Sequence, residues 1–190
     1  MNIAGDPLPA DAKLAWWGEE LRDWQRQRSR HPLGRVLEPH RAPWFELAEA
    51  LPVAIRLRDP PRSEEHAFDT VMPLAKAIAD VERVLFDVAV DRGIEWTSSV
   101  APQILATRLE GAGEAALPAG PSNQPPLSQA DWSRALLRRW PETPVGPLPR
   151  RLSGALARSQ LQRFRLGGEA VATLSPPRAL WLGWRAARRP

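Results

Sequence analysis

The chain has 190 residues, and its formal net charge is +4 at pH 7, with no cysteine and three histidines. The absence of cysteine excludes disulfides, thiolate catalysis and cysteine-ligated metal sites, and the histidines lack a metal-ligand spacing. No apolar run approaches the ~20 residues of a transmembrane helix, and the residues after Met1 do not resemble a signal peptide. We therefore expect one cytoplasmic domain.

The basic charge is concentrated near the C-terminus, where residues 128–190 contain 12 arginines and three acidic residues. Such an imbalance can mark a surface for nucleic acid or anionic lipid. However, Lys13 and Lys76 are the only lysines in the chain. A preference for arginine throughout is typical of a GC-rich bacterial genome, and we favour this compositional explanation.

The first predicted helix runs from an N-cap at Asp11 to about Ser29. It must end before Pro32, because the residue that precedes a proline avoids the helical conformation. A short helix is predicted between Pro43 and Pro52. The first helix carries an apolar stripe at helical spacing, formed by Leu14, Trp17, Leu21 and Trp24.

Two longer helices are predicted in the middle of the chain. The first begins at Ser63, which can cap it, and extends to about Val90 with a kink or a break at Pro73. The second begins near Glu95 and ends at the glycines that follow Glu110.

Two proline-rich loops, residues 117–127 and 141–149, flank a short predicted helix over residues 128–140. A further helix ends at Gly167, and Pro176 opens the last one. There is no internal repeat and no alternating pattern of a β-strand longer than a few residues. We expect an all-α fold in a single domain that spans residues 1–190.

The segment KLAWWGEELRDWQRQRSRHPLGRVLEP, residues 13–39, contains two adjacent tryptophans, an acidic pair and a His-Pro dipeptide. It resembles the conserved helix of the squalene/phytoene synthase family, which reads approximately as Lys or Arg, Leu, Ala-Trp-Trp, one residue and Glu-Glu-Leu, followed by His-Pro. The resemblance covers the first forty residues well and residues 68–86 more loosely. Its signature positions are Trp16, Trp17, Glu20, Leu21, His31 and Pro32.

This resemblance implies an isoprenoid-synthase-like helical bundle around a central cavity, and a place in terpenoid biosynthesis. In working family members, two Asp-x-x-x-Asp motifs on facing helices hold magnesium ions, which bind the diphosphates of two isoprenyl substrates. The spacing suits this role because carboxylates four residues apart lie on one helical face.

The acidic motifs are missing or degenerate in this chain. Only Asp6 and Asp11 precede or open the signature helix, so we expect an incomplete bundle. The segment from Gln103 to Pro118 corresponds to the second motif, with Glu110 and Glu114 in place of its aspartates. The glycines between them weaken a helix by about 1 kcal/mol each. We therefore expect a vestigial metal site, no other cofactor, and magnesium only if the protein is active.

We expect a squalene/phytoene-synthase-like protein that is non-catalytic and acts through binding or assembly contacts. One alternative is an isoprenoid transferase that condenses prenyl diphosphates and whose first aspartate motif lies upstream of Met1. Another alternative is a basic binding module for anionic lipid or nucleic acid, built on the C-terminal arginines.

The expected partner surface is the apolar stripe of the first helix. Without the family's opening helices this stripe loses part of its cover, which favours self-association or a protein partner. The last helix places Leu180, Trp181 and Trp184 on one side. We expect it to dock on the bundle, with a peripheral contact to an anionic membrane as the alternative. Isoprenyl diphosphate is expected as a ligand only if the protein is active, and nucleic acid is not expected.

Overall fold

A computed structural model of the chain describes residues 7–87, 96–120, 125–142, 145–165 and 174–188. Within these segments every regular element is a helix, which confirms the all-α prediction. Two short 3-10 helices, η1 (Glu38–His40) and η2 (Gly113–Ala116), follow α2 and α6. The α-helices are α1 (Pro7–Gln25), α2 (Pro32–Leu37), α3 (Trp44–Ala50), α4 (Val53–Arg56), α5 (Glu64–Leu85), α6 (Thr97–Ala112), α7 (Gln129–Arg138), α8 (Leu148–Arg165) and α9 (Pro176–Arg188).

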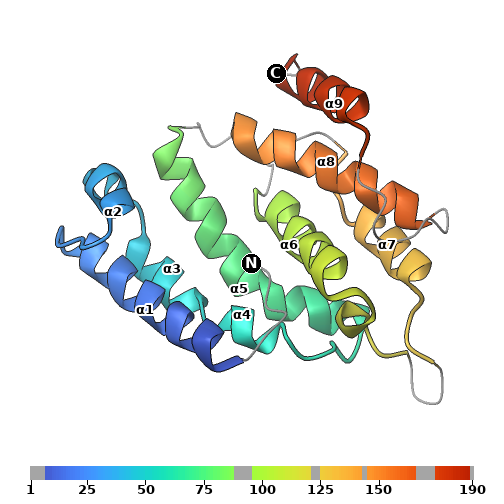
Figure 1. The fold of residues 1–190 in the computed structure, drawn as a ribbon, viewed down its shortest axis with the longest axis horizontal. Coiled ribbons are helices and arrows are strands. Elements are labelled where there is room, and N and C mark those ends of the chain that lie inside the picture. The colour runs from blue at the N-terminus through green and yellow to red at the C-terminus, as the bar shows by residue number, and fades with distance from the viewer. Residues whose placement is uncertain (1–6, 88–95, 121–124, 143–144, 166–173, 189–190) are drawn as a thin grey trace.

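The helices form a sequential array in which neighbours along the chain are mostly neighbours in space (Figure 1). α1 packs against α3, α3 against α5, and α5 against α6. α6 then contacts both α7 and α8, and α9 lies on α8. The N-terminal helices and α9 are therefore at opposite ends of the array, with α5 between them (Figure 1).

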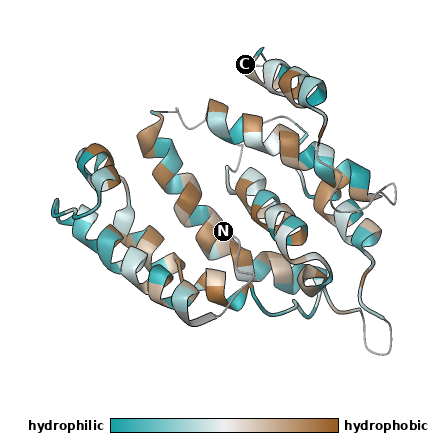
Figure 2. Cartoon of the chain, in the orientation of Figure 1, coloured by the Kyte–Doolittle hydropathy of each residue, from teal (hydrophilic) through white to brown (hydrophobic). Residues whose placement is uncertain are grey.

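Two hydrophobic clusters hold the array together. The larger one lies between α5, α6, α7 and α8 and includes Trp132 and Leu161, which are almost completely buried. The smaller one joins α1 and α3 to α5 through Trp24, Trp44 and Val81. Figure 2 shows hydrophobic and hydrophilic residues interspersed along these helices, as expected when one face of each helix enters a core. α5 contributes to both clusters and so connects the two ends of the molecule.

Helix α5 follows the sequence prediction at its start. The Ser63 side chain accepts a hydrogen bond from the His66 N–H at 3.1 Å and caps the helix. The helix passes through Pro73 without a break, but it changes direction along its length (Figure 1). A bend is expected there, because proline lacks the N–H group that the helix would use. The helix ends at Leu85, before the predicted end near Val90.

Helix α1 begins and ends earlier than predicted. It starts at Pro7, so Asp11 lies inside the helix instead of capping it, and the Asp11 carboxylate pairs with Arg58. It ends at Gln25, before the predicted end near Ser29. The short helices α2 and α4 were not predicted, because a helix of one or two turns has too few residues to show a hydrophobic period.

The two proline-rich loops are only partly as predicted. The described residues of segment 117–127 contain no helix, in agreement with the prediction. The loop predicted over residues 141–149 is shorter, because α8 already begins at Leu148. Pro149 is tolerated in the first turn of α8, where a backbone N–H has no helical partner.

Candidate functional site

Two of the residues that carry the resemblance, Glu20 and His31, are in contact at the carboxylate of Glu20, which is 0% exposed. Its Oε1 accepts hydrogen bonds from Trp24 Nε1 at 2.9 Å, the Arg30 N–H at 2.8 Å and the His31 N–H at 2.7 Å. The Arg30 guanidinium Nε lies 3.4 Å from the other carboxylate oxygen. The Glu20 carboxylate on α1 therefore holds the residues that precede α2 in place against α1.

The surroundings of Glu20 determine its charge. Burial by itself would raise the pKa of Glu20, because it disfavours the charged form. Hydrogen bonds from the His31 N–H, the Trp24 indole and the Arg30 N–H, together with the charge of Arg30, outweigh burial and hold the pKa below its ordinary value. Glu20 is thus ionised at neutral pH, and a carboxylate with a lowered pKa is a weak general base.

An aromatic group lies beside this carboxylate. The ring centroids of Trp16 and Trp17 are 5.8 Å and 5.1 Å from that of His31. His31 is the N-cap residue of α2, and its Nδ1 accepts a hydrogen bond from the Leu33 N–H at 3.1 Å. Pro32 occupies the first turn of that helix. The structure thus brings the signature residues together, and the contacts that it shows are those of packing and helix capping.

The apolar stripe of α1 is mostly buried. Leu14, Leu21 and Trp24 are buried, and Trp17 packs half-buried against the same cluster as Trp44 of α3. The expectation that this stripe loses part of its cover is not met at these positions, because α3 packs against α1. Self-association through α1 stays a prediction. The large hydrophobic side chains that remain exposed on α1 and α2 are Trp16, Leu33 and Val36.

The structure separates the two predicted metal ligands. α6 ends at Ala112, and Gly113 adopts a positive φ of 54°. Glu114 therefore belongs to η2, while Glu110 stays on α6 and accepts a hydrogen bond from Gln160 Nε2 at 3.0 Å. No group of three His, Asp or Glu side chains gathers as metal ligands would in the described residues. Mg²⁺ requires a near-octahedral set of oxygen ligands, and Glu110 and Glu114, on two different elements, do not by themselves supply one.

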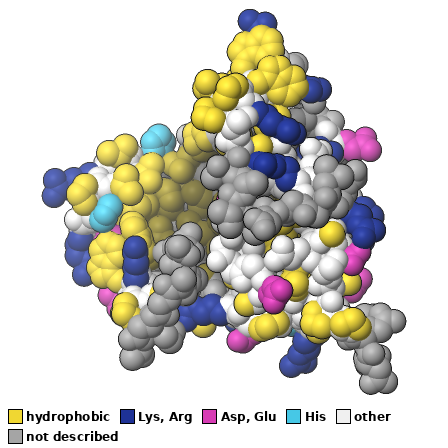
Figure 3. Space-filling view, turned by 45° about the vertical axis from the view of Figure 1, so that its right-hand side comes forward, with side chains coloured by type: hydrophobic (Ala, Val, Ile, Leu, Met, Phe, Trp, Pro, Cys, Tyr) yellow, Lys and Arg dark blue, Asp and Glu magenta, His cyan; other side chains and the backbone are white. Residues whose placement is uncertain are grey.

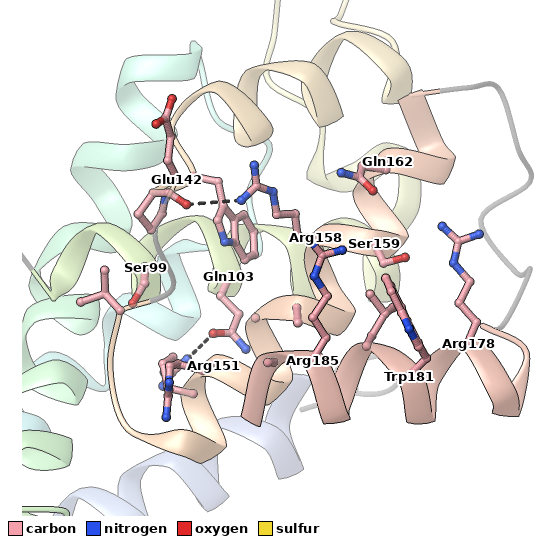
Figure 4. A pocket seen from close by; sticks show the side chains of 18 residues that line it. Ser99, Gln103, Glu142, Arg151, Arg158, Ser159, Gln162, Arg178, Trp181 and Arg185 are labelled. Atoms are coloured by element: carbon pink, nitrogen blue, oxygen red, sulfur yellow. Dashed lines mark hydrogen bonds between the residues drawn. The ribbon is translucent and has the colours of Figure 1, made fainter. Parts of the chain in front are cut away.

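A pocket of about 520 Å³ lies between α8 and α9, and the sequence analysis did not identify it (Figure 4). α6 and the segment that follows α7 complete its walls. Among the described lining residues, Glu142 is the one acidic side chain. The arginines of the lining are Arg150, Arg151, Arg158, Arg178 and Arg185.

One of these arginines, Arg150, already binds other side chains of the protein. The Arg150 guanidinium binds both oxygens of the Glu82 carboxylate and donates to Gln103 Oε1 at 2.7 Å. Gln103 Nε2 in turn donates to Ser153 Oγ at 2.7 Å. This half-buried network ties α5, α6 and α8 together at the wall of the pocket, so the Arg150 charge is already balanced by Glu82.

Three other arginines, Arg158, Arg178 and Arg185, have no acidic partner among the described residues. Arg158 makes a long hydrogen bond, 3.4 Å from Nη1 to the Pro141 carbonyl oxygen. Arg178 and Arg185 extend from α9 toward α8, and Arg158 extends from α8 (Figure 4). The available sequence signal was their spacing, because Arg178 and Arg185 are seven residues apart on one helical face.

Helix α9 packs against α8, but the side that was expected to dock carries large hydrophobic side chains that stay exposed. Ala186 is buried, whereas Leu180, Trp181 and Trp184 are 75%, 51% and 54% exposed. Arg188 lies 4.4 Å from the centre of the Trp184 ring. Figure 3 shows hydrophobic side chains gathered beside basic ones at the top of the view, the end of the molecule where α9 lies. Within the described part of the chain, no helix has the length and hydrophobicity to cross a membrane.

Comparison with known proteins leaves the family open. No protein-family model matches the chain, and no curated protein and no solved structure shows a significant match to it. The relationship to the squalene/phytoene synthases therefore remains a proposal that depends on the signature residues quoted above.

Proposed function

We propose that this chain is a non-catalytic, squalene/phytoene-synthase-like binding protein of the cytoplasm, and that it attaches to anionic membrane surfaces through α9. The observation that carries the proposal is the exposure of Leu180, Trp181 and Trp184 on a helix that is otherwise rich in arginine. A site for membrane contact needs such an apolar face together with positive charge.

The apolar face of α9 suits a membrane interface better than water. Trp181 and Trp184 lie three residues apart, on the same side of the helix. Indole rings favour the boundary between headgroups and acyl chains, because their bodies are apolar and their N–H groups can still find hydrogen-bond partners. Three large exposed hydrophobic side chains on one short helix are unusual for a surface that meets only solvent.

The charge around this face complements an anionic lipid. Arg178, Arg185 and Arg188 flank the exposed tryptophans, and α9 contains no acidic residue. Each basic side chain close to an anionic surface contributes about 1 kcal/mol. The attachment is therefore expected to weaken as salt concentration rises, since exposed charges are screened.

The non-catalytic part of the proposal is supported by the roles of the signature residues. Glu20 is committed to fastening the entry of α2, and His31 to capping that helix. Glu110 and Glu114 lie on different elements. These side chains leave no preformed arrangement to stabilise a departing pyrophosphate, which such chemistry requires.

Vesicle co-sedimentation tests the attachment. We expect the protein to bind phosphatidylglycerol vesicles and not phosphatidylcholine vesicles. Replacing both exposed tryptophans, Trp181→Ser with Trp184→Ser, removes most of the apolar face and should weaken binding by roughly tenfold or more. The matched control is Phe45→Ser, which removes an exposed aromatic ring from α3 at the other end of the array and should leave binding unchanged.

Two results would contradict the proposal. One is that the wild-type protein fails to bind anionic vesicles at low salt. The other is that binding persists in the double tryptophan variant and extends equally to duplex DNA. The second result would indicate a purely electrostatic surface and favour the nucleic-acid alternative.

A further inference from the structure

We propose that the pocket between α8 and α9 is a binding site for a phosphate or diphosphate group, held by Arg158, Arg178, Arg185 and the hydroxyl of Ser159. The inference goes beyond membrane attachment, because it assigns a ligand to the pocket between two helices, which shares Trp181, Arg178 and Arg185 with the exposed face of α9. It requires neither that α9 enter a bilayer nor that the chain be related to the synthases.

The first observation is an unpaired buried hydroxyl. Ser159 is 3% exposed, and its Oγ has no hydrogen-bond partner among the described residues. The residue lines the pocket, and Figure 4 shows its side chain between Trp181 and Gln162. Buried hydroxyls are nearly always paired. A ligand oxygen in the pocket would accept the hydrogen bond that the protein leaves unmade.

The second observation is that three arginines without an acidic partner line one pocket. Arg158, Arg178 and Arg185 come from facing helices and line the same pocket without an acidic partner in the described residues. Glu142, the acidic residue of the described lining, directs its carboxylate away from them (Figure 4). A pocket lined by positive charges that no acidic side chain balances attracts anions.

The donor set indicates the chemistry of the ligand. Each guanidinium presents a planar fork of N–H donors, which matches the oxygens of phosphate in bidentate geometry. Three such forks and a hydroxyl exceed what the two oxygens of a carboxylate can accept. A phosphate or diphosphate offers more oxygens and a charge closer to that of the three arginines.

Calorimetric titration of the full chain with inorganic pyrophosphate and with inorganic phosphate tests the site. We expect binding, and a loss of affinity of roughly tenfold in Arg158→Gln and in Arg178→Gln. Ser159→Ala should weaken binding severalfold without changing net charge. The matched control is Arg35→Gln on α2, which removes the same charge from an exposed site at the opposite end of the molecule and should bind as the wild type does.

A second experiment, with vesicles that contain phosphatidic acid, distinguishes a lipid headgroup from a soluble phosphate ester as the source of the phosphate. Displacement from these vesicles by pyrophosphate, with weaker vesicle binding in Ser159→Ala, identifies a lipid headgroup. Unchanged vesicle binding alongside intact pyrophosphate binding identifies a soluble phosphate ester. Both results support the site, and neither depends on the tryptophan variants that test membrane attachment.

The proposal is overturned if neither anion binds and pyrophosphate does not compete with vesicles. It is also overturned if Arg35→Gln weakens binding as much as Arg178→Gln, since that would reflect net charge alone. Arg178 is exposed on α9, so its replacement leaves the core intact and tests the site even if Arg158→Gln does not fold.

Discussion

At the scale of single residues, Glu20 illustrates what a buried charge requires in a helical core. An ionised carboxylate removed from water is strongly destabilising unless charges and hydrogen bonds compensate it. Here the donors come from α1 itself, through Trp24, and from the returning chain, through Arg30 and His31. Removing the charge should therefore loosen the junction of α1 and α2 while leaving the other end of the array unaffected.

We predict that Glu20→Gln lowers the free energy of unfolding by about 2 kcal/mol, the value of one or two charge-assisted hydrogen bonds. Glutamine keeps one acceptor oxygen, but its amide group faces the Arg30 guanidinium, and both groups are donors. Urea unfolding followed by circular dichroism measures the change. Glu19→Gln is the control, because the Glu19 side chain is 69% exposed, and it should change stability by less than about 0.5 kcal/mol.

The same residue gives a prediction about pH. Because the folded-state pKa of Glu20 is lowered, its stabilising contribution is complete above the ordinary glutamate pKa of about 4.3 and is lost as the pH falls through the lower folded-state value. The stability difference between wild type and Glu20→Gln should therefore be constant near neutrality and shrink on acidification. A difference that grows as the pH falls would show that the pKa is raised instead.

At the scale of elements, α2 approaches α1 closely because residue 34 is glycine. A Cβ at Gly34 would lie 2.2 Å from Ser29 Cβ and 2.4 Å from Trp24 Nε1. These atoms belong to the segment that surrounds Glu20, so there is little room for adjustment. Glycine at position 34 lowers the helix propensity of α2, but it permits the close approach that brings His31 to the Glu20 carboxylate.

We predict that Gly34→Ala destabilises the protein by about 1–3 kcal/mol, the usual cost of overpacking, although alanine favours helices. Gly111→Ala is the matched control, because a Cβ at Gly111 in α6 would meet nothing within 4 Å. That substitution should be neutral or stabilising by up to about 1 kcal/mol. Thermal or urea unfolding of both variants provides the comparison, and destabilisation by both would rule out the steric explanation.

The helices that could be predicted from the sequence are the long ones and those that begin at a capping residue. Ser63 and Ser128 both cap the helices that they were expected to start, since a cap depends on a local hydrogen bond. The same local reasoning failed at Asp11, because its carboxylate is used by Arg58, which is distant in the sequence. It succeeded at the end of α6, which stops at Ala112 among the glycines that follow Glu110, but it did not predict the 3-10 helix η2 that comes next.

At the scale of the whole molecule, we predict that the isolated chain has no prenyl-transfer activity. Ionising an allylic diphosphate requires preorganised stabilisation of the pyrophosphate that leaves. The described acidic residues do not provide it, since Glu110 is engaged by Gln160 and Glu114 lies on η2. Incubation with magnesium and farnesyl or geranylgeranyl diphosphate should release no pyrophosphate above background. Turnover that disappears in Glu110→Ala, but not in Glu46→Ala on α3, would contradict this prediction.

The sequence alone determined that the chain is helical and that α9 combines tryptophan with arginine, and it suggested the resemblance carried by Trp16, Trp17, Glu20 and His31. These properties depend on residue type and short-range periodicity, which can be read along the chain. Only the tertiary structure decided that the buried Glu20 carboxylate holds the start of α2 against α1 and that α3 covers α1. It also decided that Leu180, Trp181 and Trp184 of α9 are at least half exposed. It alone placed the arginines of α8 opposite those of α9, because pairing between helix faces depends on loops and packing that local patterns do not specify.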